Sequence, residues 1–228
     1  MKRTIKETGL RVVILVVGLT IAHLGVTLFL LADLGADPFN VMIQGLFRTV
    51  AEIDIFEGLT HGYTHMAICF LIIIILLIVD KSYIKIGTLL CMICGGPIID
   101  FFTWVFGGII NAGNPFWVRI LVLGLGCVIL AYGMTIVIKS DSGTGPNDLV
   151  AIVISDKSKK PFGIMRIIVD VCFVIAGFLM GGVVGIGTII CAALVGPVAG
   201  IFLPRNEKLI NIIVSKIIKD KRENGATD

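Results

Sequence analysis

Six long apolar runs constrain the fold of this chain more than any other feature. A helix needs about 20 apolar residues to cross the ~30 Å hydrocarbon core of a bilayer. The run that begins at Met66 has 14 residues, and it reaches spanning length when its helix starts at Tyr63. Only 15% of the residues are charged, whereas soluble domains contain about 25%. We therefore expect an all-α integral membrane protein with six spanning helices, over about residues 10–32, 63–79, 86–110, 116–138, 167–184 and 186–203.

A short motif follows two of these runs, as Leu34–Val41 (LGADPFNV) and again as Ser142–Leu149 (SGTGPNDL). The residues that recur 108 positions later are Arg11, Gly18, Ile21, Gly25, Gly35 and Pro38. Further along each half the offset is 100, because Gly87-Thr88 recurs as Gly187-Thr188. This pattern predicts two repeats of about 95 residues, with a first membrane repeat over 1–113, a second over 114–204 and a tail over 205–228.

The segments after the two motifs leave two topologies open. The second segment, about residues 146–155, would form a helix of about 15 Å, which is too short to cross the bilayer. If both segments are half-helices, each repeat has three spans and the repeats are inverted; if both span, there are eight spans and the repeats are parallel. Basic residues gather on the cytoplasmic side, and the inverted topology misplaces two of them, whereas the parallel topology misplaces three. We expect inverted repeats with both termini in the cytoplasm.

The motif itself predicts a break between two helices. Gly35 and Gly143 can end a helix in a left-handed conformation, and Pro38 and Pro146 are tolerated in a first helical turn. Helix starts at membrane depth leave backbone N–H groups to be satisfied, and matched broken helices mark the substrate site of secondary transporters. The candidate substrate-binding residues are Asp37, Asn40, Gln44, Asn147 and Asp148. The alternative is that these side chains only cap the turns.

Arg166 and Asp170 form the strongest charge signal within the apolar runs. They are four residues apart, hence on one helix face, where ionisable groups usually face a bundle interior. A guanidinium can bind a carboxylate or phosphate through two contacts, so we add both residues to the candidate substrate site. The alternatives are a structural pair that joins two helices, or an arginine that reaches the cytoplasmic surface.

Three further ionisable residues are candidates for a proton or solute pathway: His23, His65 and Asp100. The pair His61 and His65 has helical spacing, but it lacks the additional ligands of a metal site, and we expect no metal and no cofactor. The six cysteines lie within apolar runs and imply packing rather than disulfides. No recognisable catalytic motif is present, so we do not expect an enzyme.

The tail alternates isoleucines with lysines, which predicts an amphipathic helix on the cytoplasmic face of the membrane. The expected partners are the lipid bilayer and a small-molecule solute, and we expect no nucleic acid. Small residues on the spanning helices would also suit a homodimer.

The repeated turns, the stretch Phe162–Arg166 with Asp170, and Val184–Thr188 leading to Gly196-Pro197 resemble the YczE/YyaS family of bacterial integral membrane proteins. Members of this family typically carry Trp-Asp at Phe39-Asn40, Arg-Asp at Asn147-Asp148 and Glu at Asp170. The resemblance covers nearly the whole chain. It implies a bacterial protein with several spans, and no transport reaction is established for the family.

Two functions remain open at this point. The first is a secondary transporter of a small polar or anionic solute, and the second is a membrane-embedded accessory or sensor protein without transport activity. A large polar cavity between the repeats would favour the transporter, whereas a dry, filled interface would favour the accessory protein. The sequence does not specify the substrate, the coupling ion or the direction of transport.

Overall fold

The computed structural model describes residues 4–35, 37–51 and 61–224, and in these ranges it contains helices and no strand. The helices are α1 (Ile5–Ala32), α2 (Pro38–Ala51), α3 (His61–Asp80), η1 (Lys81–Tyr83), α4 (Ile86–Phe106), α5 (Phe116–Ser140), α6 (Pro146–Ser158), α7 (Phe162–Leu179) and α8 (Ile186–Asn224). Six of them, α1, α3, α4, α5, α7 and α8, are long and apolar enough to span a membrane. The expected all-α chain with six candidate spans is confirmed.

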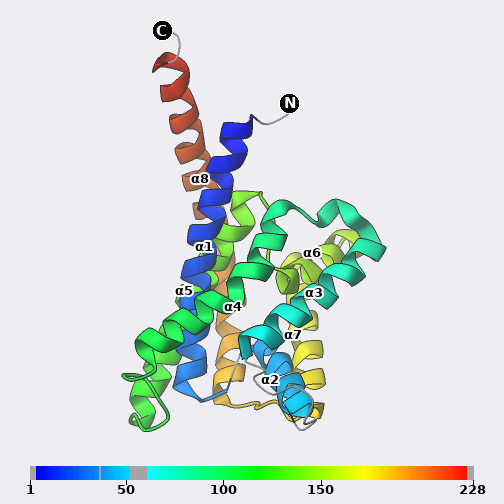
Figure 1. The fold of residues 1–228 in the computed structure, drawn as a ribbon, viewed down its shortest axis with the longest axis vertical. Coiled ribbons are helices and arrows are strands. Elements are labelled where there is room, and N and C mark those ends of the chain that lie inside the picture. The colour runs from blue at the N-terminus through cyan, green and yellow to red at the C-terminus, as the bar shows by residue number, and fades with distance from the viewer. Residues whose placement is uncertain (1–3, 36, 52–60, 225–228) are drawn as a thin grey trace.

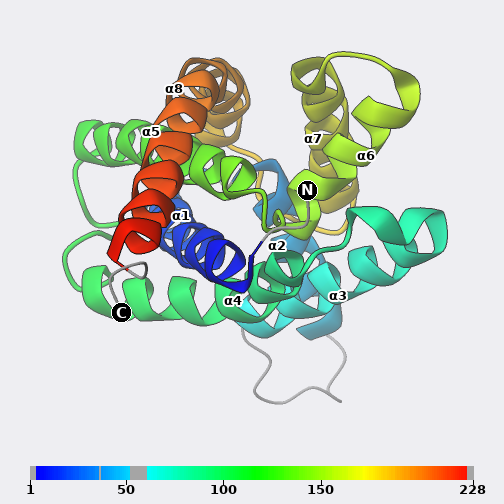
Figure 2. The same ribbon diagram turned by 90° about the horizontal axis from the view of Figure 1, so that it is seen from above.

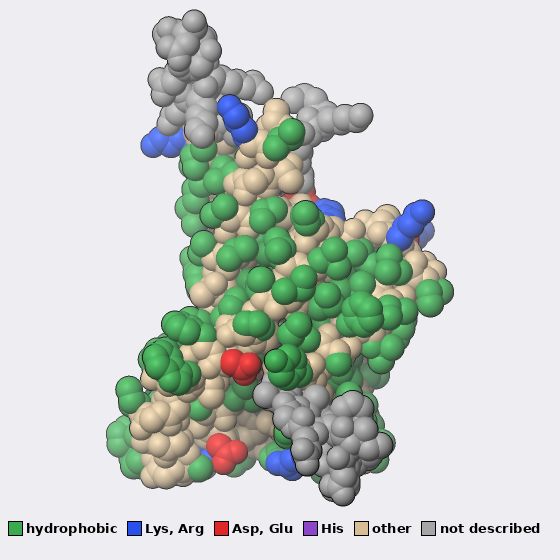
Figure 3. Space-filling view, in the orientation of Figure 1, with side chains coloured by type: hydrophobic (Ala, Val, Ile, Leu, Met, Phe, Trp, Pro, Cys, Tyr) green, Lys and Arg blue, Asp and Glu red, His purple; other side chains and the backbone are tan. Residues whose placement is uncertain are grey.

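The outer surface is strongly apolar, as a lipid-facing surface requires. Large hydrophobic side chains such as Ile78 and Trp104 are more than four-fifths exposed. Hydrophobic side chains cover most of the face in Figure 3, and charged side chains on it are few. A soluble monomer rarely exposes apolar patches of this extent, so the described helices fit a bilayer rather than water.

The two short helices begin after matching turns. Asp33 and Asp141 adopt the left-handed conformation at the ends of α1 and α5, with φ of 49° and 56°. Gly35 and Gly143 follow with φ of 114° and 144°. The helices therefore end two residues earlier than we expected from the glycines, because an aspartate also tolerates the left-handed region. At 14 and 13 residues, α2 and α6 are about 20 Å long.

Helices α1 and α5 pack closely at the centre of the molecule and run antiparallel (Figure 1). Glycines permit this approach, since a Cβ atom at Gly25 would lie 2.4 Å from the backbone nitrogen of Leu130, and one at Gly133 would lie 2.3 Å from that of Ala22. Small residues at such crossings are a usual means of helix packing in membranes. This pair is the centre on which the other helices assemble.

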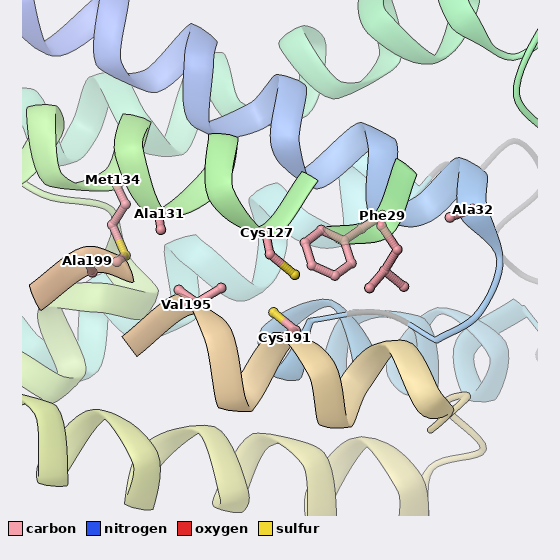
Figure 4. Packing of buried hydrophobic residues seen from close by; sticks show 9 residues of the cluster. Phe29, Ala32, Cys127, Ala131, Met134, Cys191, Val195 and Ala199 are labelled. Carbon is pink, nitrogen blue, oxygen red and sulfur yellow. The ribbon is translucent and has the colours of Figure 1, made fainter. Parts of the chain in front are cut away.

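A cluster of buried apolar residues joins α8 to this pair. Phe29 from α1, Leu123 and Cys127 from α5, and Cys191 from α8 are almost completely inaccessible. Figure 4 shows the side chains of Phe29, Cys127 and Cys191 meeting between the three helices. Helices α2, α3, α6 and α7 lie on the other side of the molecule (Figure 2). Among them, α2 packs against α7 and α6 against both α3 and α7.

Four contacts link the ends of helices from the two halves of the chain. Arg11 donates to the carbonyl of Ser140 at the end of α5 (3.2 Å), and Arg119 donates to the carbonyl of Ala32 at the end of α1 (2.7 Å). The backbone N–H of Gly87 donates to the Ser142 carbonyl (2.9 Å), and that of Gly187 donates to the Leu34 carbonyl (2.8 Å). Each half thus satisfies carbonyl groups that the helix ends of the other half leave open.

The tail differs from the separate surface helix that we expected after about residue 204. Helix α8 continues through Pro197 and Pro204 to Asn224, and it ends at the same end of the molecule at which α1 begins (Figure 1). Asn206 donates to the Thr135 hydroxyl (2.7 Å), and Ile210 and Val214 are buried in a cluster with residues of α1 and α5. These contacts hold the continuation of α8 against α1 and α5.

Candidate functional site

The two repeated turns meet at one internal cavity of about 70 Å³. Asp37, Phe39 and Asn40 line it from the first turn, and Asn147 and Asp148 line it from the start of α6. Its other lining residues include His23 of α1, His65 of α3, Cys91 of α4, Met134 of α5 and Arg166 of α7. A volume of this size holds a few water molecules or the polar end of a small solute. The site thus draws residues from both halves of the chain.

Arg166 lies at the centre of an ion-pair network. Its Nε atom contacts both carboxylate oxygens of Asp170, at 2.9 and 3.0 Å, and its Nη1 atom donates to Asp148. The three side chains are only 13%, 15% and 10% exposed. A buried guanidinium is costly unless it is paired, and here two carboxylates neutralise it. The predicted pair with Asp170 is present, and Asp148 joins it from α6.

Asp37 has a different environment. One carboxylate oxygen accepts from the backbone N–H of Asn40 at 3.3 Å, and the other accepts from the Asn40 side chain at 2.5 Å. Asp37 therefore caps the start of α2, and it also lines the cavity. It is 7% exposed, and among the residues that the structure describes it forms no salt bridge. Capping and cavity lining, which the sequence left as alternatives, coexist at this residue.

Two histidines and a phenylalanine form one wall of the cavity. His23 Nδ1 lies 2.9 Å from the Leu19 carbonyl, and because a carbonyl can only accept, Nδ1 carries a hydrogen and Nε2 is left as an acceptor in the neutral ring. The His65 ring stands edge-on to those of His23 and Phe39, with centroid distances of 6.1 and 5.5 Å. Gly95 leaves room for the pair, since a Cβ there would lie 2.8 Å from His23 Nε2.

Three predicted site residues lie elsewhere. Asp170 reaches the central cavity only through Arg166, and it lines the adjoining cavities instead. Gln44 is not among the residues that line the described cavities, and its buried Oε1 atom has no hydrogen-bond partner in the described part of the chain. Asp100 is exposed on α4, with its carboxylate beside Gly62 at the start of α3.

Phe39 and Met134 are among the lining residues that the sequence did not predict. Phe39 stands inside the repeated motif, between Pro38 and Asn40, and its position beside the polar residues was the available signal. Met134 lies with its sulfur 3.8 Å from Arg166 Nη1. Nothing in the sequence distinguishes Met134 from the other apolar residues of its run.

Two further cavities extend from the site along α7 and α8. One of about 240 Å³ shares Asp37, Met134 and Arg166 with the central cavity and reaches Phe162 and Leu203. The other, of about 370 Å³, shares Asp170 and Pro38 with the former and is otherwise lined mostly by apolar residues of α7 and α8. Residues of α7 and α8 line most of both cavities. The site is therefore bordered by a gap between α7 and α8.

No group of three or more metal-binding side chains occurs among the described residues. The charged groups at the site are instead three carboxylates, of Asp37, Asp148 and Asp170, and one guanidinium. This arrangement suits reversible binding of a polar solute through charge and hydrogen bonds.

Comparison with known proteins identifies the family to which the chain belongs. Residues 9–204 match the model described as "Family of unknown function (DUF6198)". The chain belongs to the DUF6198 family. It is 30% identical over 212 residues to the uncharacterized membrane protein YczE of Bacillus subtilis, covering 92% of this chain and 94% of that protein. The expected YczE/YyaS relationship is confirmed.

Two other proteins are similar to this DUF6198 member. The uncharacterized protein YyaS of Bacillus subtilis is 26% identical, covering 84% of this chain and 92% of YyaS. An uncharacterized protein of Haemophilus influenzae is 28% identical, covering 83% of this chain and 82% of that protein. No solved structure shows a significant match. A membrane-protein relative and six apolar helices together indicate a bacterial membrane protein.

Proposed function

We propose that this protein is a secondary transporter of a small polar solute. The observation that carries the proposal is the meeting of both broken-helix turns, together with the Arg166 network, around one polar cavity. In secondary transporters, discontinuous helices in matched positions of two repeats form the substrate site. The short helices α2 and α6 begin at such positions.

Reciprocal contacts support an inverted arrangement of two repeats. Arg11 and Arg119 are 108 positions apart, and each donates to the last carbonyl of the opposite central helix, Ser140 or Ala32, which are also 108 apart. An arginine near the start of each helix can reach the end of the other only if α1 and α5 are antiparallel. Parallel repeats would give these helices the same direction, so the contacts favour three spans and one half-helix in each repeat.

An asymmetry between the halves supplies a path for the solute. Helices α3 and α4 correspond to α7 and α8 in the second repeat, yet α3 packs on α4 while cavities separate α7 from α8. In an inverted-repeat transporter, exchange of the two arrangements moves the opening from one side of the membrane to the other. We infer that closing the gap between α7 and α8 accompanies opening between α3 and α4.

The accessory or sensor function is less well supported. Such a protein needs no route between its interior and its surroundings, and the cavities that adjoin Arg166 and Asp37 have no role in it. The experiment that tests transport asks whether the central cavity can be reached from both sides of a sealed membrane. Asn147→Cys should react with an impermeant thiol reagent from either side, whereas a reaction from one side alone would contradict alternating access.

A further inference from the structure

We propose that the transported solute is a monovalent organic cation, an ammonium compound with a small apolar body. This inference rests on the proposed function and names the chemical class of solute for the same site. It differs from the anionic solute that Arg166 alone would indicate. Three features of the site point to such a solute: an unbalanced negative charge, groups that attract a cation, and an apolar surface beside them.

The ionisable groups at the site carry a net negative charge. Arg166 is in contact with two carboxylates, those of Asp148 and Asp170, so its positive charge is more than balanced before a solute enters. Counting Asp37 with this network, the formal charge is −2, from three carboxylates and one guanidinium. The starts of α2 and α6 contribute roughly half a positive charge each. A net charge of about −1 remains, which one monovalent cation would balance.

The negative charge that no basic residue of the described chain balances lies at Asp37. Asp37 has no basic partner among the described residues, and its two hydrogen bonds both come from Asn40, a neutral residue. Asp37 is buried and lines the cavity. A buried carboxylate without a cation is costly, so an ammonium group that enters the cavity gains a partner that the protein itself does not provide.

His23 and Phe39 add attraction for a cation on one wall of the cavity. His23 uses its Nδ1 hydrogen on the Leu19 carbonyl, so the neutral ring presents Nε2 as an acceptor. The Phe39 ring lies on the same wall, and an aromatic face attracts cations. A carboxylate, a neutral imidazole and an aromatic ring together suit an N–H donor with a positive charge. An anion beside them would be repelled by the Asp37 carboxylate.

The apolar body of the solute follows from the adjoining cavities. The cavity between α7 and α8 is lined by Ile167, Val171, Ile189 and neighbouring apolar residues, with Asp170 as its ionisable side chain. A fully hydrated ion would gain nothing from this surface, whereas a hydrocarbon or aromatic group would bury apolar area. The ammonium group would lie near Asp37 and the apolar group toward the gap between α7 and α8.

Three probes of similar size test whether the solute is a cation, a neutral molecule or an anion. Benzylammonium, benzyl alcohol and benzoate share an aromatic ring and differ in charge, so thermal unfolding of the purified protein in detergent at pH 7 can compare them at equal concentrations. A ligand that binds only the folded state raises the melting temperature. We expect a concentration-dependent rise with benzylammonium and none with benzoate. A rise with benzoate, equal effects of all three probes, or no effect of benzylammonium would overturn the proposal.

Substitution of Asp37 tests the site. Asn also caps helices, so Asp37→Asn removes the charge and retains the cap of α2. We expect it to weaken benzylammonium binding about tenfold or more, because hydrogen bonds to charged groups exceed neutral ones in strength. The matched control is Asp33→Asn, which makes the same change four residues earlier on a side chain that is 69% exposed. Asp37→Glu, which restores the charge, should bind better than Asp37→Asn.

Equal loss in both asparagine variants, or unchanged binding in Asp37→Asn, would also overturn the proposal. These outcomes are separate from a failure of the transport proposal. Two-sided labelling of residue 147 requires no solute, so it can succeed when benzylammonium does not bind. Conversely, benzylammonium can bind to a protein whose cavity opens to one side only.

Discussion

Arg166 on α7 donates a hydrogen bond to Asp148 in the first turn of α6, and the same guanidinium contacts Asp170 one turn further along its own helix. Helices α6 and α7 are therefore joined at the cavity by a buried, charged contact. Helix α6 cannot move away from α7 at this point unless this contact breaks. The network consequently links the shape of the site to the packing of the surrounding helices.

The first prediction concerns the stability that this network provides. Arg166→Ala leaves two carboxylates buried without their cation, and removing one partner of a buried pair costs about 3–5 kcal/mol. We expect a large fall in the melting temperature of the purified protein in detergent. Addition of Asp148→Asn to Arg166→Ala should restore part of the loss, because one of the two unpaired charges is then removed. If the double variant loses as much stability as the two single variants lose together, Arg166 and Asp148 are not directly coupled.

The second prediction concerns the close contact of α1 and α5. Gly133→Ala would place a Cβ atom 2.3 Å from the backbone nitrogen of Ala22, a contact that requires the helices to separate. We expect a loss of about 1–3 kcal/mol, as for other overpacked sites. Gly124→Ala on the same helix is the matched control, because nothing lies within 4 Å of its added Cβ. The control should unfold at or slightly above the wild-type temperature. Equal stability of the Gly133→Ala and Gly124→Ala variants would contradict a close contact between α1 and α5 at Gly133.

The third prediction concerns topology. With six spans and a cytoplasmic amino terminus, the loop between α4 and α5 faces the outside of the cell, whereas eight spans would place it in the cytoplasm. Ala112 is an exposed residue of this loop. In a variant without native cysteines, Ala112→Cys should react with an impermeant thiol reagent added to intact cells. Lys159→Cys, in the loop between α6 and α7, should react only after the cells are opened. Reaction of Ala112→Cys only after the cells are opened, as for Lys159→Cys, would indicate eight spans and contradict the inverted arrangement.

The sequence predicted the parts of this fold that depend on local chemistry. The six apolar runs became the six candidate spans, because length and hydropathy suffice to identify such helices. The glycine and proline spacing identified both helix breaks, and the turns around Asp37 and Asp148 meet as their matched positions indicated. Each of these predictions used residues that are close together in the sequence or repeated in it.

The features that the sequence did not specify depend on long-range contacts. The guanidinium of Arg119 binds the carbonyls of Ala32 and Asp33 and so satisfies the end of α1. Helix α8 continues past Pro204 because Asn206 and the residues after it have partners on α1 and α5. The position of Gln44 away from the cavity depends on the rotation of α2, which the apolar pattern of its 14 residues did not define.

The measurement that tests the central claim most directly is two-sided labelling of the cavity. In a variant without native cysteines, Asn147→Cys and Phe39→Cys place a thiol on the cavity wall from each half of the chain. Each variant is exposed to an impermeant thiol reagent in right-side-out and in inside-out vesicles. Leu123→Cys is the control, because this residue is completely buried between helices and should react in neither.

We expect both cavity thiols to react in both vesicle orientations, because the proposed transport requires the cavity to open to each side in turn. The variants must also unfold at a defined temperature, which shows that they are folded. Reaction in one orientation only, or in neither, for both folded variants would contradict transport through this cavity. The duplicated turns and the Arg166 network would then serve the architecture of the bundle alone.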